Sequence, residues 1–205
     1  PTQVHEPGSL AQLIREEHGM GRRLPLYGVH RLDIPVTGVV LYARTREAAA
    51  AIAGYFSNGT VRKRYWAAVS APPTETAGFF EHYIIHDGRM NKASCSDTFR
   101  KGSRLCRTGY RIFGRSDRYW FLELEPETGR THQLRAQLGR TGCPIKGDQK
   151  YGARRGNPSR LIHLHACSLT FPHPAGGSQV YVVAEPPDDP VWAAAIEQYG
   201  RSTEP

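Results

Sequence analysis

Apolar residues recur every three or four positions in four segments of this chain, which is the spacing of a helix with one buried face. Each segment follows a residue whose side chain can accept a hydrogen bond from the first helical turn. The predicted helices are Ser9 to Glu17, Thr45 to about Asn58-Gly59, Thr131 to Leu138, and a final helix capped by Asp188 or Asp189 that contains Trp192 and Ile196.

Shorter apolar or alternating runs, bounded by glycine and polar residues, predict strands. These strands are Gly38–Ala43, Val61–Val69, Gly78–Ile85, Gly109–Phe113, Tyr119–Leu124, His163–Phe171 and Gln179–Ala184. Strands outnumber helices and several neighbours are linked as hairpins. We therefore expect an α+β fold with a central mixed, mostly antiparallel sheet flanked by helices. The even spread of proline and glycine predicts one domain over residues 1–205.

The net charge of the chain indicates what kind of partner it could bind. The chain has 27 Lys and Arg against 19 Asp and Glu, a net charge of +8. The segment from Arg89 to Arg118 holds nine basic and two acidic residues, a net +7. Such a block favours a polyanion, because each phosphate contact releases condensed counterions. An arginine-rich solvated surface is the alternative interpretation.

The remaining composition is that of a globular protein, with 39% hydrophobic and 22% charged residues. No apolar run approaches the roughly 20 residues of a membrane span. We therefore expect a cytoplasmic protein that does not act on a membrane.

The four cysteines and the late histidines raise the question of a metal. The cysteines form no C-x-x-C pair, so free thiols are expected rather than a zinc knuckle. His163, His165 and Cys167 share one side of a predicted strand, with His173 beyond it. No Asp or Glu accompanies them, and the alternation with apolar residues fits a half-buried strand, so we expect no metal.

One aspartate stands among apolar neighbours. Asp33 lies between Leu32 and Ile34, and Pro35 prevents a helix from running through it, which places it on a loop before a strand. A carboxylate there either faces solvent as a turn residue or is held by a partner, because burying it alone is costly. Arg31 projects to the same side on an extended segment, as a salt-bridge partner or as a guanidinium that replaces an extruded base.

A second stretch offers a partner for that carboxylate. On the helix after Gly129, Leu134 and Leu138 share the buried face, and His132 and Arg135 share the neighbouring stripe. A partly buried Arg needs an anion, and Asp33 is the candidate, since a guanidinium can hold a carboxylate with two hydrogen bonds. The alternative is a phosphate-binding or purely structural Arg135.

Between these stretches an aromatic pair follows three basic residues. In Arg62-Lys63-Arg64-Tyr65-Trp66, Tyr65 alternates with basic neighbours, an arrangement that suits a stacked base beside its phosphate. The alternative is that Tyr65 and Trp66 are ordinary core and surface residues of a strand.

Together these stretches resemble the RluA-type pseudouridine synthases, enzymes that isomerise uridine in structured RNA, over about residues 24 to 186. The similar segments are His30-Arg31-Leu32-Asp33 with Thr37-Gly38, Lys63 to Ala67, Gly129 to Arg135, Pro144 to Gly152, Leu164-His165-Ala166 and Phe171 to Pro174.

The resemblance implies a pseudouridine synthase fold and assigns roles to individual residues. Asp33 is the catalytic aspartate, which attacks the ribose or assists glycal formation, Tyr65 stacks on the base and helps to remove a proton, and Arg135 pairs with Asp33. Leu164 backs the pocket. The RNA-binding residues would be Arg31, Arg62, Lys63, Arg64, Arg130 and His132. Structured ribosomal or transfer RNA is the implied partner, with no cofactor and a monomeric enzyme.

Two departures from the family pattern concern the ends of the chain. Members usually begin with a strand and a Lys-Pro-x-Gly turn, whereas this sequence starts at Pro1-Thr2-Gln3, so we expect that strand to be missing. No S4-like RNA-binding module is recognisable. The choice of target would then rest on the catalytic domain or on missing sequence.

The alternative function is a catalytically silent protein that binds structured RNA, in which the basic charge and the stacking aromatics remain but Asp33 has no partner that needs it.

Overall fold

The computed structural model describes residues 9–19 and 24–203 and divides the chain into two compact units. The first unit contains Pro1–Leu32, Val40–Val61 and Thr170–Tyr181, and the second contains Asp33–Val39, Arg62–Leu169 and Val182–Pro205. The units interleave along the chain, so neither is a continuous segment, and the single domain expected over residues 1–205 stays a prediction. The expected lack of the family's N-terminal strand concerns the part of the family pattern ahead of Pro1 and stays a prediction.

The first unit carries two capped helices and a small sheet. Ser9 accepts a hydrogen bond from the Gln12 amide and Thr45 accepts one from the Ala48 amide, as their cap positions predict. Its elements are α1 (Leu10–Glu17), the antiparallel pair β1 (Tyr27–Gly28) and β3 (Tyr42–Ala43), and α2 (Arg46–Ser57). His30 has a structural role, because it accepts a hydrogen bond from the Leu41 amide and stacks on Phe56.

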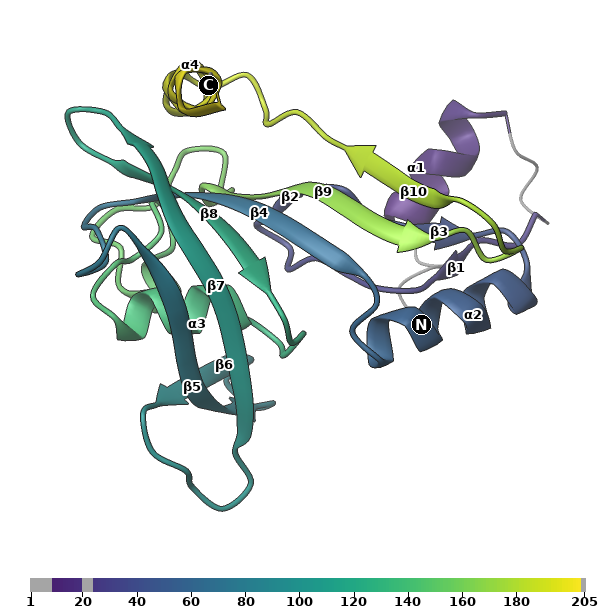
Figure 1. Cartoon of the computed structure of the whole chain (residues 1–205), viewed down its shortest axis with the longest axis horizontal. Helices are drawn as coiled ribbons and strands as arrows, with labels where there is room; N and C mark the ends of the chain where they lie inside the picture. The colour runs from purple at the N-terminus through teal and green to yellow at the C-terminus, as the bar shows by residue number, and fades with distance from the viewer. Residues whose placement is uncertain (1–8, 20–23, 204–205) are drawn as a thin grey trace. The chain divides into compact units, whose positions relative to one another are not determined.

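The second unit holds most of a mixed sheet with strand order β10-β9-β4-β8-β7-β5-β6 (Figure 1). Neighbouring strands from β4 to β6 in this order pair antiparallel, whereas β2 pairs parallel with β9. The boundary between the two units runs through β9 and β10. The strands are β2 (Thr37–Gly38), β4 (Arg62–Val69), β5 (Ala77–Asp87), β6 (Lys92–Ser96), β7 (Arg104–Arg115), β8 (Trp120–Pro126), β9 (Leu164–Pro172) and β10 (Gln179–Val183). The expected α+β fold with a mixed, mostly antiparallel sheet is confirmed.

The single strand predicted over Gly38–Ala43 is wrong. That segment supplies two separate pairs of residues, β2 and β3, which join different sheets. Gly38 has φ +120, a backbone conformation that interrupts an extended strand, so the apolar run could not reveal the break.

Helices of the second unit cover its core. They are α3 (Gln133–Arg140), the short 3-10 helix η2 (Gln149–Tyr151) and α4 (Pro190–Thr203). Leu134 and Leu138 of α3 join the main buried cluster of β4 and β8 side chains. Asp189 accepts a hydrogen bond from the Val191 amide and so caps α4. Trp192 of α4 is buried with Ala68 and Phe121, which point to the opposite face of β4 and β8 from the main cluster.

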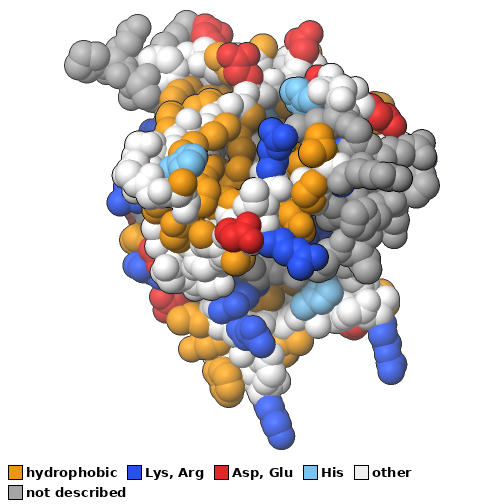
Figure 2. All heavy atoms as spheres, turned by 90° about the vertical axis from the view of Figure 1, so that its right-hand side faces the viewer, with side chains coloured by type: hydrophobic (Ala, Val, Ile, Leu, Met, Phe, Trp, Pro, Cys, Tyr) orange, Lys and Arg blue, Asp and Glu red, His pale blue; other side chains and the backbone are white. Residues whose placement is uncertain are grey.

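Some basic residues of the segment from residue 89 to residue 118 are paired with acidic side chains, so fewer of them are available to bind a polyanion than the net charge suggests. Arg107 pairs with Glu127 at 3.0 Å and Arg111 pairs with Glu123 at 2.8 Å. The exposed basic residues toward β6 and the start of β7 are Arg89, Lys92, Arg100, Lys101 and Arg104. Figure 2 shows one face of the molecule, where Lys and Arg side chains are scattered among hydrophobic ones and several project at the lower edge.

All four cysteines are free thiols, as expected. Within residues 9–19 and 24–203, none of the helices combines the length and apolar character that crossing a membrane requires.

Candidate active site

The loop that carries Asp33 is fastened on its C-terminal side to a distant strand. The Val36 amide donates to the Asp33 carbonyl at 2.9 Å and closes a turn, as Pro35 predicts. The Ile162 amide then donates to the Pro35 carbonyl, and the Val39 amide donates to the Ala166 carbonyl, both at 2.9 Å. The aspartate therefore lies on a rigidly held loop of the second unit.

A buried histidine adds a side-chain anchor to this loop. His165 Nε2 lies 2.9 Å from the Ala184 carbonyl oxygen, which can only accept, so this nitrogen carries the proton. Nδ1 is then an acceptor, and the Thr37 hydroxyl donates to it at 2.8 Å. Burial lowers the pKa of His165, which keeps the ring neutral in this role. Thr37, which follows the stretch His30-Arg31-Leu32-Asp33, is therefore hydrogen-bonded to His165 of the Leu164-His165-Ala166 stretch.

These contacts also bear on the metal alternative. Both His165 nitrogens are used within the protein, and His163 Nε2 lies 3.0 Å from Asp189. Across the described ranges 9–19 and 24–203 there is no group of three His, Cys, Asp or Glu side chains that could hold a metal ion.

Gly38 allows β2 to lie directly against β9. A Cβ at position 38 would stand 2.3 Å from the Ala166 carbonyl oxygen, in addition to the strain of φ +120. We expect Gly38→Ala to lower the free energy of unfolding by more than the roughly 1–3 kcal/mol of backbone strain alone. Urea unfolding of Gly102→Ala is the control, because Gly102 has φ +86 and nothing within 4 Å. Equal losses in the two variants would contradict the clash with β9.

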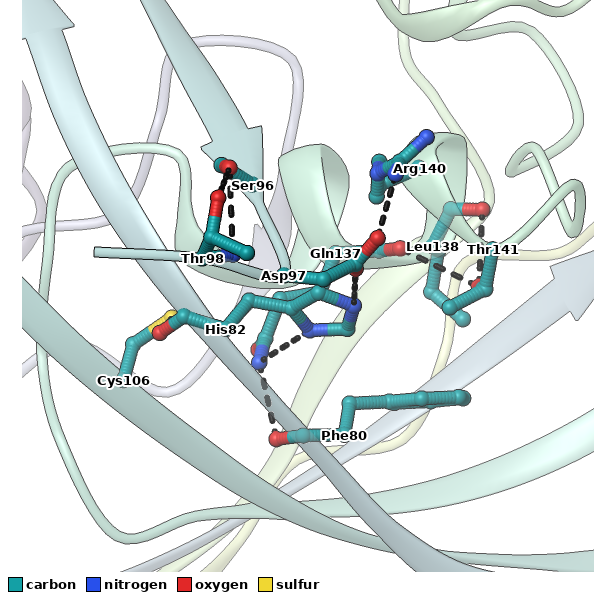
Figure 3. A network of polar contacts seen from close by, with 10 residues as sticks. All are labelled: Phe80, His82, Ser96, Asp97, Thr98, Cys106, Gln137, Leu138, Arg140 and Thr141. Atoms are coloured by element: carbon teal, nitrogen blue, oxygen red, sulfur yellow. Dashed lines mark hydrogen bonds and ion pairs between the residues drawn. The ribbon is translucent and has the colours of Figure 1, made fainter. Parts of the chain in front are cut away.

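The other half of the site is on α3, which is held by buried polar contacts with the sheet. The Gln137 amide nitrogen donates to the Phe80 carbonyl at 2.9 Å and its oxygen accepts from the Thr108 hydroxyl at 2.7 Å. Figure 3 shows this amide beside His82, which faces Asp97, while Asp97 also pairs with Arg140 at the end of α3. Since a buried amide is stable only when it is hydrogen-bonded, these contacts fix the position of α3 along the sheet.

The first turn of α3 differs from the prediction. Thr131 is not the cap; His132 occupies the N-cap position, in the left-handed region, and makes no side-chain cap hydrogen bond. Instead Gln133 reaches back, and its Oε1 accepts hydrogen bonds from the Arg130 amide and the Thr128 hydroxyl. Short-range cap rules could not predict this, because the stabilising group is inside the helix.

Arg135 lies between two carboxylates and is only 5% exposed. Its Nε and Nη2 donate to the two oxygens of Asp148 at 2.7 and 2.8 Å, and its Nη1 donates to Asp33 Oδ2 at 3.1 Å. The pairing of Arg135 with Asp33 was expected, but the two-pronged contact goes to Asp148. Asp148, at 1% exposure, is more buried than Asp33, whose side chain is 16% exposed.

The electrostatic balance keeps this guanidinium charged. Burial opposes the charge, but the hydrogen bonds and negative charges of Asp148 and Asp33 more than offset it and raise the pKa of Arg135. The Tyr151 ring lies 5.0 Å from the guanidinium carbon and adds a cation–π contact. Sequence reasoning missed both Asp148 and Tyr151, although both belong to the Pro144–Gly152 stretch.

The residues Leu164, Tyr65 and Val36 belong to or pack against one buried cluster of the second unit. Leu164 is 3% exposed and belongs to the main core cluster, and Tyr65 and Val36 pack against that cluster. Burial first, and the Asp33 charge second, raise the pKa of Tyr65 to about 12. Tyr65 is therefore a neutral phenol at neutral pH.

The basic residues expected to contact RNA are not equivalent. Lys63 donates to the Thr128 carbonyl at 3.3 Å, on the same side of β4 as Tyr65, and burial lowers its pKa. Arg64 pairs with Glu125 at 2.7 Å and projects to the opposite side of the strand. Arg62, Arg130 and Arg31 are exposed, and Arg31 belongs to the first unit.

Comparison with known proteins identifies relatives along most of the chain. The family model described as RNA pseudouridylate synthase matches residues 12–139. A tRNA pseudouridine synthase C from Salmonella typhimurium is 33% identical and aligns with 92% of this chain and 76% of its own length. The protein of the same name from Pectobacterium carotovorum is 30% identical; the alignment covers 92% of this chain but only 53% of that relative.

Solved structures show the same fold. Human RNA Pseudouridylate Synthase Domain Containing 4 superposes with a TM-score of 0.74 at 24% identity, over 97% of this chain and 86% of that chain. Human RNA Pseudouridylate Synthase Domain Containing 1 gives a TM-score of 0.75 at 25% identity, over 90% and 76%.

Proposed function

Because the chain belongs to the RNA pseudouridylate synthase family, we propose that it converts uridine into pseudouridine in a structured RNA, with Asp33 as its catalytic carboxylate. The observation that carries this assignment is the contact of Asp33 with Arg135, across 102 residues of sequence, close enough to Tyr65 for the Asp33 charge to raise the pKa of that phenol. A carboxylate with a charged partner and an aromatic neighbour suits a flipped base.

Asp33 supplies the reactive atom. Its contacts with Arg135 and His132 both use Oδ2, which leaves Oδ1 for the ribose. In one route Oδ1 bonds to ribose C1′ and the glycosidic bond breaks, so its electron pair stays on the uracil. In the other route the carboxylate takes a ribose proton and a glycal forms. In both, uracil turns and its carbon 5 bonds to C1′; in the first route this breaks the Asp33–C1′ bond, and in the second the carboxyl group returns its proton to C2′. The proton lost from carbon 5 is balanced by one gained at nitrogen 1.

Arg135 and Asp148 fix the orientation of the catalytic carboxylate. The bidentate pair with Asp148 fixes the conformation of the Arg135 side chain, so that Nη1 is already directed at Asp33. The net charge of the three groups is −1, and Asp33 is the more exposed carboxylate. The unneutralised charge is therefore available where the substrate would lie.

Tyr65 and the basic residues together offset the cost of extruding a base. Stacking on one aromatic ring is worth about 1–3 kcal/mol, and extrusion costs a few kcal/mol. Tyr65 therefore needs support from phosphate contacts, for which Arg62, Lys63 and Arg130 of the second unit are the candidates. A contact of Arg31 with the RNA stays a prediction from the sequence. The pKa of about 12 makes Tyr65 a stacking group and a proton donor rather than a phenolate base at neutral pH.

Structured ribosomal or transfer RNA is the proposed substrate, and transfer RNA is the first to test because relatives that align with most of this chain carry that name. The cytoplasmic location and the monomeric state belong to the same proposal. Purified protein should form pseudouridine in unmodified tRNA or rRNA transcripts, detected by nucleoside mass spectrometry. RNA binding without any pseudouridine would favour the catalytically silent alternative, and mapping with and without the gene would identify the uridine.

Replacing Arg135 by Lys should separate chemistry from binding. Lys keeps the positive charge but cannot contact both oxygens of Asp148 and Oδ2 of Asp33 together, so Asp33 loses its fixed orientation. We expect the single-turnover rate at saturating RNA to fall by about 10²–10³-fold, with RNA affinity within a few-fold of wild type. Arg140→Lys is the matched control, because Arg140 is on the same helix and pairs with an exposed aspartate. An unchanged rate in Arg135→Lys would show that Arg135 has no role in the chemistry of the active site.

A further inference from the structure

His132 is held in an unfavourable backbone conformation. Three described residues other than glycine have positive φ, namely Asn91, His132 and Arg160, and the other two are exposed. His132 has φ 55 and is 6% exposed. A buried side chain in the left-handed region persists only when its surroundings fix it there, which points to a requirement for this imidazole in this place.

A chain of hydrogen bonds determines where the imidazole proton lies. The Ala93 amide donates to Tyr151 Oη at 2.8 Å, and Tyr151 Oη lies 2.8 Å from His132 Nδ1. Among the described residues no other acceptor lies within hydrogen-bond distance of this hydroxyl, so it donates its proton to Nδ1. In a neutral ring the remaining proton is then on Nε2, and Nε2 lies 3.7 Å from Asp33 Oδ2.

The charges around the ring favour its neutral form. The groups that face it are Asp33, Arg135, Lys150, His86 and the Tyr151 hydroxyl. Burial is the largest influence and lowers the pKa of His132; the positive neighbours Arg135 and Lys150 lower it further, against the opposing effect of Asp33. A neutral ring has a single N–H, so its tautomer decides whether it can donate to Asp33.

We infer that His132 is a positioning residue of the active site, whose Nε2–H is directed at Asp33 Oδ2 by the Tyr151 hydroxyl and the Ala93 amide. This inference rests on the proposed function. Together with Arg135 Nη1, the imidazole gives Oδ2 two donors and leaves Oδ1 for the ribose. The separation of 3.7 Å exceeds a hydrogen bond, and such contacts commonly shorten when the substrate is bound. The Tyr151 hydroxyl and the Ala93 amide act through His132, whereas the Tyr151 ring also contacts Arg135.

Two substitutions at position 132 separate this role from a structural one. In His132→Asn the amide occupies the place of Nδ1, tolerates the left-handed backbone and can still meet Tyr151, but nothing reaches Asp33. In His132→Gln the longer side chain places an N–H donor near the former Nε2. We expect the single-turnover rate at saturating RNA to fall about 10–100-fold in His132→Asn and to recover to within about fivefold of wild type in His132→Gln. A wild-type rate in the Asn variant, or equal losses in both, would overturn the inference.

The tautomer can be measured without turnover. Nitrogen-15 NMR of the histidine rings should show His132 near pH 7 as a neutral ring with its proton on Nε2, and Tyr151→Phe should remove this preference. A ring protonated on Nδ1 in the wild-type protein would refute the proposed arrangement. Wild-type protein that binds RNA but forms no pseudouridine would instead refute the proposed function, so the two failures are distinguishable.

Discussion

Asp33→Asn should abolish pseudouridine formation while the protein stays folded and still binds RNA. An amide neither attacks ribose C1′ nor removes a ribose proton, so we expect the rate to fall by at least about 10⁴-fold, as for loss of a nucleophile in other enzymes. Arg135 keeps both hydrogen bonds to Asp148, so the fold does not depend on the charge at position 33. RNA affinity should stay within a few-fold, measured by titration alongside nucleoside analysis of the product.

Asp117→Asn is the matched control for this experiment. Asp117 is exposed on the turn between β7 and β8, and its substitution removes the same unit of charge from the same unit of the protein. It should leave both the rate and the affinity near wild type. If Asp33→Asn lost RNA affinity in proportion to activity, Asp33 would serve binding or folding instead of chemistry.

Asp148→Asn should have the largest effect on stability. The substitution replaces the bidentate carboxylate of the buried Arg135 by a neutral amide and leaves the single hydrogen bond to Asp33 as its charged contact. Breaking a buried ion pair costs about 3–5 kcal/mol. For a chain of this size each kcal/mol corresponds to roughly 2–4 °C in Tm. Urea unfolding should therefore show a much lower midpoint with an unchanged slope, and activity should fall because Arg135 is no longer oriented.

The double variant Asp148→Asn/Arg135→Met tests whether the loss comes from the unpaired charge. It removes the guanidinium as well, so it should be more stable than Asp148→Asn alone. Glu127→Gln serves as the control for an exposed pair, because Glu127 contacts Arg107 at the surface and its loss should cost at most about 1 kcal/mol. Losses of similar size in Asp148→Asn and Glu127→Gln would contradict the buried pair.

Local signals in the sequence predicted the ends of the helices well. Ser9, Thr45 and Asp189 cap the helices that they were expected to cap, because each acts through a hydrogen bond within its own turn. Prediction failed where the stabilising partner lies far along the chain or beyond the cap position. Thr131 resembles a cap, yet the side chain of Gln133 accepts the hydrogen bond at the start of α3. Likewise, the residues of β2 and β3 look like one strand until their partners β9 and β1 are known.

The same distinction applies to the site. The need of Arg135 for an anion follows from its place on an apolar helix, and Asp33 was a correct partner. Which carboxylate would receive two hydrogen bonds could not be derived, because it depends on where η2 places Asp148 relative to α3. The available signal was Asp148 itself, an acidic residue between Gly147 and Gln149 that follows the buried Ile145.

The parallel pairing of β2 with β9 has a consequence for biosynthesis. Thr37 and Gly38 are anchored by His165 and Ala166, which a ribosome adds more than a hundred residues later. A nascent chain that ends at Gly152 already contains Asp33 and the stretch from Gly129 to Arg135. It does not yet contain the β9 residues that hold the segment after Asp33. We therefore expect the loop that carries Asp33 to reach its final conformation only after β9 has been synthesised.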